Sequence, residues 1–208
     1  MKVSSSTQTF KPGAFEGFFS GWLRTRQSRE IAEWALSLLE IDPADRILEI
    51  GAGIGSVVQL AAQQCPLGLV AGIEADPFLV RRARRRNKID IMHGRIVIGN
   101  GSVSALPYPD SSFHKVYSIN SVQHWPHLLR DLKEIHRVLR PGGKLVIVRH
   151  LWEGKGRKTA RAKLNQDIQE RLPQQIGMAG FDVVYREIRL MTPASAYGIV
   201  GSKILVEV

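Results

Sequence analysis

The chain has 208 residues, of which 44% are hydrophobic and 23% are charged, and its formal net charge is +10. This length suits one domain with a sizeable core, and the composition argues against a disordered or fibrous chain. No apolar run approaches the length of a membrane span, and the first residues lack the apolar core of a signal peptide. The single cysteine, Cys65, excludes an internal disulfide framework and a cysteine-based metal site. We therefore expect a cytoplasmic protein without a membrane span or a metal site.

Residues 1–27 are rich in serine, glycine and aromatic side chains, and they precede the first clear helical pattern. We interpret them as an arm that closes over a site as a lid, with ordinary packing of a short helix as the alternative. The aromatic side chains that would form such a lid are Phe15, Phe18, Phe19 and Trp22. Residues 28–208 are expected to form the main domain.

The middle of the chain alternates helical patterns with short apolar runs. In chain order, the patterns predict a helix at 28–40, a strand at 46–50, a helix at 56–65, a strand at 68–75, a helix at 76–88, strands at 95–101 and 112–120, a helix at 127–139, a turn at 140–143 and a strand at 144–150. The helix at 76–88 has the clearest start, because Asp76 suits the N-cap and Pro77 the first helical position.

The last third predicts a polar helix near 159–172, a break at 173–181, and two strands at 182–190 and 197–208. Apolar strands that alternate with helices favour a parallel sheet that is covered on both faces. We therefore expect one α/β domain with a doubly wound, Rossmann-like sheet of seven strands, mostly parallel, with an antiparallel C-terminal hairpin at its edge.

The stretch EIGAGIGS (49–56) directly follows the first predicted strand. In doubly wound sheets, ligands bind at this edge, and Gly51, Gly53 and Gly55 permit positive φ and close approach of a ligand to the main chain. The third glycine comes one residue too early for a dinucleotide fingerprint. Glu49 would repel a phosphate and suits a positively charged ligand. A tight turn without a ligand is the alternative.

Glu74 ends the second predicted strand, 23 positions after Gly51. An acidic residue about this far beyond a glycine loop commonly accepts hydrogen bonds from ribose hydroxyls. A solvated carboxylate at the end of a strand is the simpler alternative, and the glycine loop favours the ribose interpretation.

Four stretches resemble the successive motifs of the class I S-adenosylmethionine-dependent methyltransferases. They are ILEIGAGIGSVV, GIEADPFLVRRA, GNGSVSALPYPDSSFHKVYSIN and IHRVLRPGGKLVIV. The resemblance is closest to the small-molecule type, which includes enzymes that methylate quinones and sterols, and it covers about residues 28–150. The tail is similar to the last two strands of that family. The resemblance implies S-adenosyl-L-methionine as the cofactor and a small molecule as the methyl acceptor.

The resemblance also implies roles for individual residues. It places the methionine part of the cofactor at Glu49, Gly51, Ala52, Gly53 and Gly55, the ribose at Glu74, the adenine at Ala75, Asp76, Gly101, Ser102 and Val103, and the sulfonium and acceptor beside Ser118, Ile119, Asn120 and Val122. Two positions depart from the family pattern. Ser102 stands where aspartate is common, so either Ser102 or Asn100 would accept from the adenine amino group. His114 stands where a second aspartate is common, and we interpret it as a change at the edge of the strand without chemical meaning.

Methyl transfer by in-line displacement requires orientation and exclusion of water more than a dedicated catalytic group. A hydroxyl acceptor would benefit from a general base. His124, after the fourth strand, is the first candidate, and His150, after the fifth, is the second. For each of them, a structural hydrogen bond is the alternative interpretation.

Much of the positive charge lies in residues 81–88 and 155–163. A solvated helix face explains the first segment, and binding to nucleic acid is possible but not favoured. Three rival functions remain: an RNA methyltransferase, a cofactor-binding module without turnover, and a nicotinamide-dependent dehydrogenase. The early third glycine and Glu49 argue against the dehydrogenase. The oligomeric state is not predicted.

Overall fold

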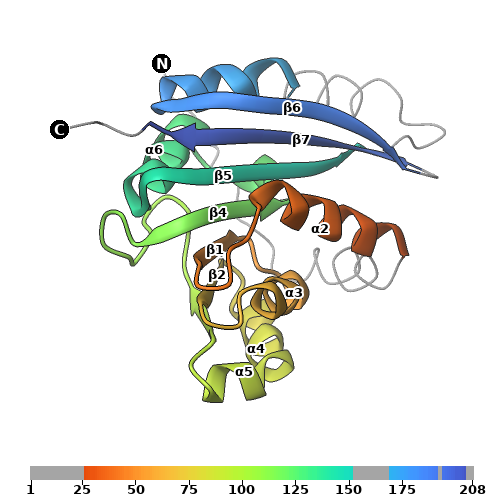
Figure 1. Cartoon of the computed structure of the whole chain (residues 1–208), viewed down its shortest axis with the longest axis vertical. Coiled ribbons are helices and arrows are strands. Elements are labelled where there is room, and N and C mark those ends of the chain that lie inside the picture. The colour runs from red at the N-terminus through yellow and green to blue at the C-terminus, as the bar shows by residue number, and fades with distance from the viewer. Residues whose placement is uncertain (1–25, 152–168, 192–193, 205–208) are drawn as a thin grey trace, which may run out of the picture.

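The structure is a computed structural model that describes residues 26–151, 169–191 and 194–204 (Figure 1). Its helices and strands are α2 (Arg26–Leu39), β1 (Arg46–Ile50), α3 (Ser56–Gln64), β2 (Leu69–Glu74), α4 (Pro77–Arg86), α5 (Lys88–Met92), β3 (Ile96–Asn100), β4 (Phe113–Ile119), the 3-10 helix η1 (Val122–His124), α6 (Leu128–Val138), β5 (Leu139–Leu151), β6 (Phe181–Met191) and β7 (Ala194–Lys203). Residues 169–178 are also helical. The proposed lid, apart from its last two residues, and the basic segment 155–163 lie outside the described residues.

The strands form one seven-stranded sheet in the order β3-β2-β1-β4-β5-β7-β6. Neighbours from β3 to β5 pair in parallel, whereas β7 runs antiparallel to both β5 and β6. The predicted mostly parallel sheet with an antiparallel C-terminal hairpin is thus confirmed. The strand order reverses between β1 and β4, so the carboxyl ends of these two strands flank the crevice where such sheets bind ligands.

Apolar side chains form one core layer on each face of the sheet. Helices α2, α3 and α4 cover one face, and α6 with the helical residues 169–178 covers the other. Figure 1 shows α3, α4 and α5 gathered beside β1 and β2, away from β6 and β7. Each fully buried aliphatic side chain contributes about 1.5–3 kcal/mol to folding, so this two-layer core is the main source of stability. Among the described residues, no helix has the length and apolar character needed to cross a bilayer.

Two predicted boundaries need correction. The turn expected at 140–143 is instead the irregular start of β5, where the pairing register with β4 shifts and Gly142 has φ 74°. The expected break at 173–181 begins too early, because residues 173–178 continue a helix. Leu172 and Ile176 lie one turn apart in that helix and are both buried, which explains why the helix persists past Pro173.

Helix α5 was not predicted at all. It follows Asn87, the C-cap of α4, and spans only five residues. Ile89 and Met92 on this helix are 70% and 74% exposed. A five-residue helix in which only Ile91 packs partly against the core leaves no apolar periodicity in the sequence, so periodicity could not reveal it.

Candidate functional site

The glycine loop after β1 is hydrogen-bonded to the carboxyl end of β2. The backbone N–H groups of Gly51 and Ala52 both donate to the Ile73 carbonyl, at 2.8 and 3.0 Å. The Gly53 N–H donates to Oε2 of Glu74 at 2.9 Å. All three glycines of the loop have positive φ, between 55° and 79°, as the sequence predicted. The loop is therefore held in one conformation by β2 and its terminal carboxylate.

Two of these glycines are also required by the packing of the chain itself. A Cβ atom on Gly51 would lie 2.5 Å from Cβ of Ser121, and one on Gly55 would lie 2.5 Å from Nδ2 of Asn87. That Asn87 amide donates to the carbonyls of Gly55 and Ala83, both at 2.9 Å. Close packing within the chain is thus a reason for glycine at these two positions, in addition to the expected approach of a ligand.

Glu74 joins the glycine loop to the start of α4. Its Oε1 accepts from the Asp76 N–H at 3.0 Å, and its Oε2 accepts from the Gly53 N–H at 2.9 Å. A carboxylate has about four lone-pair sites, so each oxygen retains capacity for one more donor. The carboxylate is thus fixed in orientation, is partly exposed, and can accept further hydrogen bonds from a ligand.

The segment after β2 is held by two further side chains. Asp76 caps α4 as predicted, because its Oδ1 accepts from the Phe78 N–H at 2.8 Å. The Asn100 amide donates to the carbonyls of Glu74 and Ala75, at 2.9 and 3.1 Å. These bonds orient the Asn100 side chain and leave its Oδ1 as an acceptor beside the predicted adenine position.

The predicted adenine-edge turn follows β3 directly. The Gly101 N–H donates to the Glu74 carbonyl at 3.0 Å, which brings this turn against the end of β2. Ser102 Oγ accepts from the Ser104 N–H at 3.2 Å, and Val103 is buried. The structure therefore brings residues 101–103 and 74–76 together, and their contacts with adenine stay a prediction.

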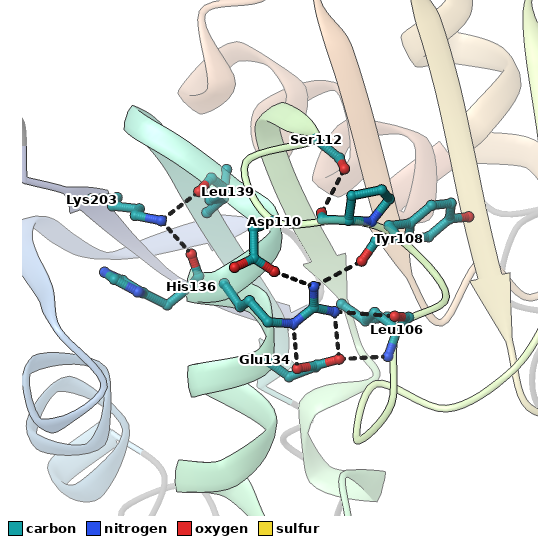
Figure 2. A network of polar contacts seen from close by, with 10 residues as sticks. Leu106, Tyr108, Asp110, Ser112, Glu134, His136, Leu139 and Lys203 are labelled. Atoms are coloured by element: carbon teal, nitrogen blue, oxygen red, sulfur yellow. Dashed lines mark hydrogen bonds and ion pairs between the residues drawn. The ribbon is translucent and has the colours of Figure 1, made fainter.

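Arg137 on α6 fixes the rest of the connection between β3 and β4, and Figure 2 labels its partners. Its guanidinium donates to the carbonyls of Leu106 and Tyr108 and pairs with the carboxylates of Asp110 and Glu134 at 2.8 Å. The hydrogen bonds that Arg137 donates to Glu134 and Asp110 raise the pKa of Arg137, and the hydrogen bond from Arg137 is the main reason that the pKa of Glu134 is lowered. The connection that carries the predicted adenine contacts is thereby anchored to a helix.

Glu49 lies beneath the loop and is only 3% exposed. The Tyr117 hydroxyl donates to its Oε2 at 3.0 Å. Burial raises the pKa of Glu49 to about 8, the Tyr117 hydrogen bond opposes this shift, and the nearby charge of Glu74 adds to it. Without a ligand, the Glu49 carboxyl is therefore mostly neutral at pH 7. A cation nearby would favour the charged form and lower the pKa again.

Ser121 links the loop to the end of β4, and sequence reasoning missed it. Its Oγ donates to the Ile50 carbonyl at 3.0 Å and accepts from Nε1 of Trp125 at 3.0 Å. The Ser118 hydroxyl lies 3.0 Å from the same oxygen and must donate to it, because the single Ser121 proton is already used. The two serines are 71 and 68 positions from Ile50, and no spacing rule connects such distant residues.

Asn120 directs its side chain toward β5. It has φ 55°, and its Oδ1 accepts from the His150 N–H at 2.6 Å. Its own N–H donates to the Val148 carbonyl at 2.9 Å. The neighbouring Val122 is buried in the core layer on the α6 side. Asn120 therefore ties the end of β4 to the end of β5, and its predicted contact with the acceptor stays a prediction.

His124 lies at the end of η1, on the surface beside the carboxyl end of β4. Gln123 Nε2 lies 3.2 Å from His124 Nε2 and also donates to the Asn120 carbonyl at 2.6 Å. Because an amide NH₂ group only donates, His124 Nε2 accepts and its proton is on Nδ1. Partial burial lowers the pKa of His124, and the charge of Arg149 lowers it further. The ring is therefore neutral at pH 7.

His114 has a structural place at the start of the sheet. Its Nδ1 accepts from the Arg46 N–H at 2.8 Å, at the first residue of β1. It is thus bonded at the amino end of the strands, opposite to the edge that holds the glycine loop.

The basic helix α4 uses several arginines within the fold. Arg84 donates twice to the Ile98 carbonyl on the edge strand β3, at 2.7 and 2.9 Å. Arg81 and Arg82 both lie 5.7 Å from the centre of the Phe78 ring. These contacts give three arginines of the helix a role within the fold. Within the described part of the chain, no cluster of three or more His, Cys, Asp or Glu side chains could hold a metal ion.

Arg149, near the carboxyl end of β5, is a second residue that sequence reasoning missed. It is 9% exposed, and its Nη1 is buried without an acceptor among the described residues. In the sequence, Arg149 is a charged residue near the end of the predicted strand KLVIVRH, where a charged side chain is normally exposed to solvent. Its burial could therefore not be predicted.

Several known methyltransferases are similar to this chain in sequence. A family profile described as "Methyltransferase domain" matches residues 48–147. The chain is 30% identical over 128 residues to the uncharacterized methyltransferase YdaC of Bacillus subtilis, and the match covers 62% of this chain and 68% of YdaC. It is 33% identical over 114 residues to 24-methylenesterol C-methyltransferase 2 of Arabidopsis thaliana, which covers 55% of this chain but 31% of the sterol enzyme. The chain thus spans about a third of that relative.

The fold agrees as well. A crystal structure of a SAM-dependent methyltransferase from Aquifex aeolicus superimposes with a TM-score of 0.75, at 15% identity, over 94% of this chain and 100% of that one. This likeness confirms the Rossmann-like methyltransferase fold. The family and the fold are those that the sequence motifs predicted. S-adenosylmethionine is the methyl donor of this family. The chain belongs to the class I S-adenosylmethionine-dependent methyltransferases.

Proposed function

We propose that this chain transfers a methyl group from S-adenosylmethionine to a small-molecule acceptor. The observation that carries the proposal is the Glu74 carboxylate, which is fixed by the N–H groups of Gly53 and Asp76 and still has free lone pairs. This arrangement suits the two hydroxyls of a ribose at the carboxyl end of β2. The neighbouring Asn100 oxygen and Ser102 hydroxyl supply acceptors for an adenine amino group.

The other end of the cofactor fits the residues beneath the glycine loop. Residues 51–55 would hold the methionine part, and the Glu49 carboxyl lies below them. A neutral buried carboxyl with a raised pKa becomes charged when a cation approaches. An ammonium or sulfonium group would meet this requirement, whereas a pyrophosphate would not.

When bound, the cofactor supplies a methyl group that is already activated by a positive sulfur. The chain then has to orient the acceptor in line with that methyl group and to exclude water, which together supply about 7–11 kcal/mol in favourable cases. Ser118, Asn120 and Val122 at the end of β4 are the residues proposed to lie beside the reacting atoms. The Ser121 hydrogen bonds to Ile50 and Trp125 hold this strand end against the glycine loop.

For a hydroxyl acceptor, we propose His124 as the general base. Its lowered pKa keeps the ring neutral at pH 7, as a base requires. Proton uptake at Nε2 requires the Gln123 amide to move away, since that amide occupies the lone pair. The rate should therefore fall as the pH drops through a value below the ordinary pKa of histidine. For a carbon or sulfur acceptor, orientation alone would serve.

A small acceptor is favoured over RNA by two observations. The sterol methyltransferase is named for a small-molecule substrate. The similarity to it covers 55% of the present chain. Three of the five arginines of α4, which suggested nucleic acid, have contacts within the fold: Arg81 and Arg82 lie against Phe78, and Arg84 bonds to the β3 backbone. We also propose a reducing, cytoplasmic setting, because the only cysteine, Cys65, is free and buried.

The proposal is tested by measuring formation of S-adenosylhomocysteine from S-adenosylmethionine with a panel of quinones, sterols, amino acids and phenols, and with bulk tRNA. We expect turnover with at least one small acceptor and none with tRNA. Glu74→Gln should reduce kcat/KM about tenfold or more, because it removes the charge that accepts from ribose. Glu33→Gln, on the exposed face of α2, is the matched control. Cofactor binding without turnover on any acceptor would instead indicate a non-catalytic module.

A further inference from the structure

Arg149 is a buried cation without a counter-charge in the described part of the chain. The residue is 9% exposed, and Nη1 is enclosed without any hydrogen-bond acceptor. No ion pair or hydrogen bond involves its guanidinium among the contacts of the described residues. Burial of the guanidinium lowers the pKa of Arg149. Such a group costs free energy unless an anion pairs with it.

Tyr197 on β7 lies beside Arg149 on β5. The two residues pair directly across β5 and β7, so their side chains project from the same face of the sheet. Tyr197 is 5% exposed, and its hydroxyl is also buried without a hydrogen-bond partner. Buried polar groups in folded proteins are normally hydrogen-bonded, and two adjacent exceptions require an explanation. Both groups can donate a hydrogen bond, so together they lack an acceptor.

These two donors lie on the acceptor side of the proposed active site. Arg149 is near enough to His124 for its charge to lower the pKa of that histidine. The next residue, His150, donates its N–H to Asn120, which joins the ends of β4 and β5. The ribose and adenine contacts lie instead at β2 and β3, on the other side of β1. An anion at Arg149 would therefore be next to the methyl acceptor.

We propose that Arg149 and Tyr197 bind an oxyanion of the methyl acceptor, a carboxylate or a phosphate. The planar guanidinium matches the two oxygens of such a group, and the Tyr197 hydroxyl supplies an additional donor. In this enclosed place the pairing is stronger than in water. The inference rests on the proposed function, because it assigns the acceptor subsite of the same reaction. It restricts the substrate to acidic small molecules.

The test uses the whole chain saturated with S-adenosylhomocysteine and compares Arg149→Met with Arg85→Met. Arg85 is exposed on α4, so both variants lose one positive charge but only one of them changes the proposed subsite. Melting temperatures are measured with benzoate, inorganic phosphate or neutral benzamide, at constant ionic strength. For the unchanged chain and Arg85→Met, we expect benzoate or phosphate to raise the melting temperature by ~5 °C at saturation, and benzamide not to. Whichever anion gives the larger rise identifies the acidic group.

Arg149→Met should lose this rise and, in buffer without either anion, should melt at the same or a higher temperature than the unchanged chain. Removal of an unpaired buried charge relieves its desolvation cost, whereas loss of a structural contact would lower the melting temperature. Tyr197→Phe should weaken the anion effect several-fold and keep the fold. A rise that persists in Arg149→Met, or no rise with either anion in the unchanged chain, overturns the proposal.

One further outcome assigns the anion to the cofactor. If Arg149→Met weakens S-adenosylhomocysteine binding tenfold or more in a calorimetric titration, then Arg149 pairs with the carboxylate of the cofactor, and the acceptor proposal is overturned. If the unchanged chain does not bind S-adenosylhomocysteine at all, the proposed function itself fails. The titration and the melting series therefore separate the two failures.

Discussion

Glu49 is the residue whose protonation most directly connects folding with cofactor binding. Its pKa is raised to about 8 by burial, against 4.5 for an ordinary glutamate. Between these two values the folded chain holds a proton that the unfolded chain has released. Stability therefore falls as the pH rises through this window, by at most about 1.4 kcal/mol per unit, and becomes level above pH 8. Below pH 4.5 Glu49 is protonated in both the folded and the unfolded chain, so its contribution to stability has reached its full value.

Glu49→Gln should remove this dependence, because glutamine mimics the neutral carboxyl and cannot titrate. We expect the free energy of unfolding of the unchanged chain, relative to Glu49→Gln, to decline steadily from pH 5 to pH 8. Urea unfolding at several pH values measures it. Parallel profiles for the two proteins would show that Glu49 is ionised in the folded state. Glu33→Gln, at an exposed position on α2, should leave the profile unchanged.

Gly51 is required by both its backbone conformation and its neighbour Ser121. Gly51→Ala adds a Cβ at φ 79° and at 2.5 Å from the Ser121 Cβ, whereas Gly94→Ala adds one at φ 70° with open space around it. The Gly94 variant should cost about 1 kcal/mol from backbone strain alone, and the Gly51 variant about 2–4 kcal/mol. Chemical denaturation of both variants measures the difference.

The double variant Gly51→Ala, Ser121→Gly tests the cause of the extra cost. Removal of the Ser121 side chain eliminates the clash, so the cost of Gly51→Ala in that background should fall toward the Gly94 value. If the cost does not change, the conformation of the loop, and not its packing on Ser121, determines the need for glycine.

At the scale of elements, two cationic side chains fasten α6 to its surroundings (Figure 2). Arg137 bonds the connection between β3 and β4, and Lys203 at the end of β7 donates to the carbonyls of His136 and Leu139 at 2.8 and 2.6 Å. The last carbonyls of a helix have no partners within it, and a lysine supplies them here. Helix α6 thus connects the proposed adenine turn with the C-terminal hairpin.

Arg137→Met should release the connection between β3 and β4. We expect a loss of about 2 kcal/mol, or ~5 °C in melting temperature, because several backbone and carboxylate acceptors lose their donor. The lowered pKa of Glu134 means that its share of this stability is complete above the ordinary glutamate pKa and is lost as the pH falls through the lowered value. The difference between the two proteins should therefore shrink in acid. Arg130→Met, on the exposed side of the same helix, is the control.

Equal melting temperatures for Arg137→Met and Arg130→Met would contradict the account of this anchor. Weaker binding of S-adenosylhomocysteine by Arg137→Met is also expected, since residues 101–103 precede the anchored segment. That effect should be smaller than the effect of changing Glu74, because Arg137 acts only through the backbone.

Elements with strong local signals were predicted well from the sequence. Helix α4 has an N-cap aspartate followed by proline, and the structure begins it at Pro77 as expected. The errors arose where tertiary contacts override local signals. Residues 140–143 read as a turn but join β5 through an irregular pairing with β4, and Pro173 read as a break although the helix continues through it. Pairing partners and buried faces cannot be read from local sequence.

At the scale of the whole molecule, the alternation of helical patterns with apolar runs was sufficient to predict the sheet but not the contacts within the site. The order of the strands follows from right-handed crossovers between parallel strands, and the position of the glycine loop and Glu74 follows from that order. Ser121 and Tyr117 act through contacts with residues far away in the chain, and Arg149 is buried by the pairing of β5 with β7, so their residue types gave no hint of these roles. The division of residues 1–27 from the main domain stays a prediction.

The central claim is that the glycine loop and Glu74 form a site for S-adenosylmethionine, and calorimetric titration tests it most directly. S-adenosylhomocysteine and NAD are titrated into the unchanged chain, Glu74→Gln and Glu33→Gln. The account predicts binding of S-adenosylhomocysteine and no binding of NAD, with affinity reduced about tenfold or more in Glu74→Gln and unchanged in Glu33→Gln. Binding of NAD without S-adenosylhomocysteine, or equal affinity in all three proteins, would contradict it.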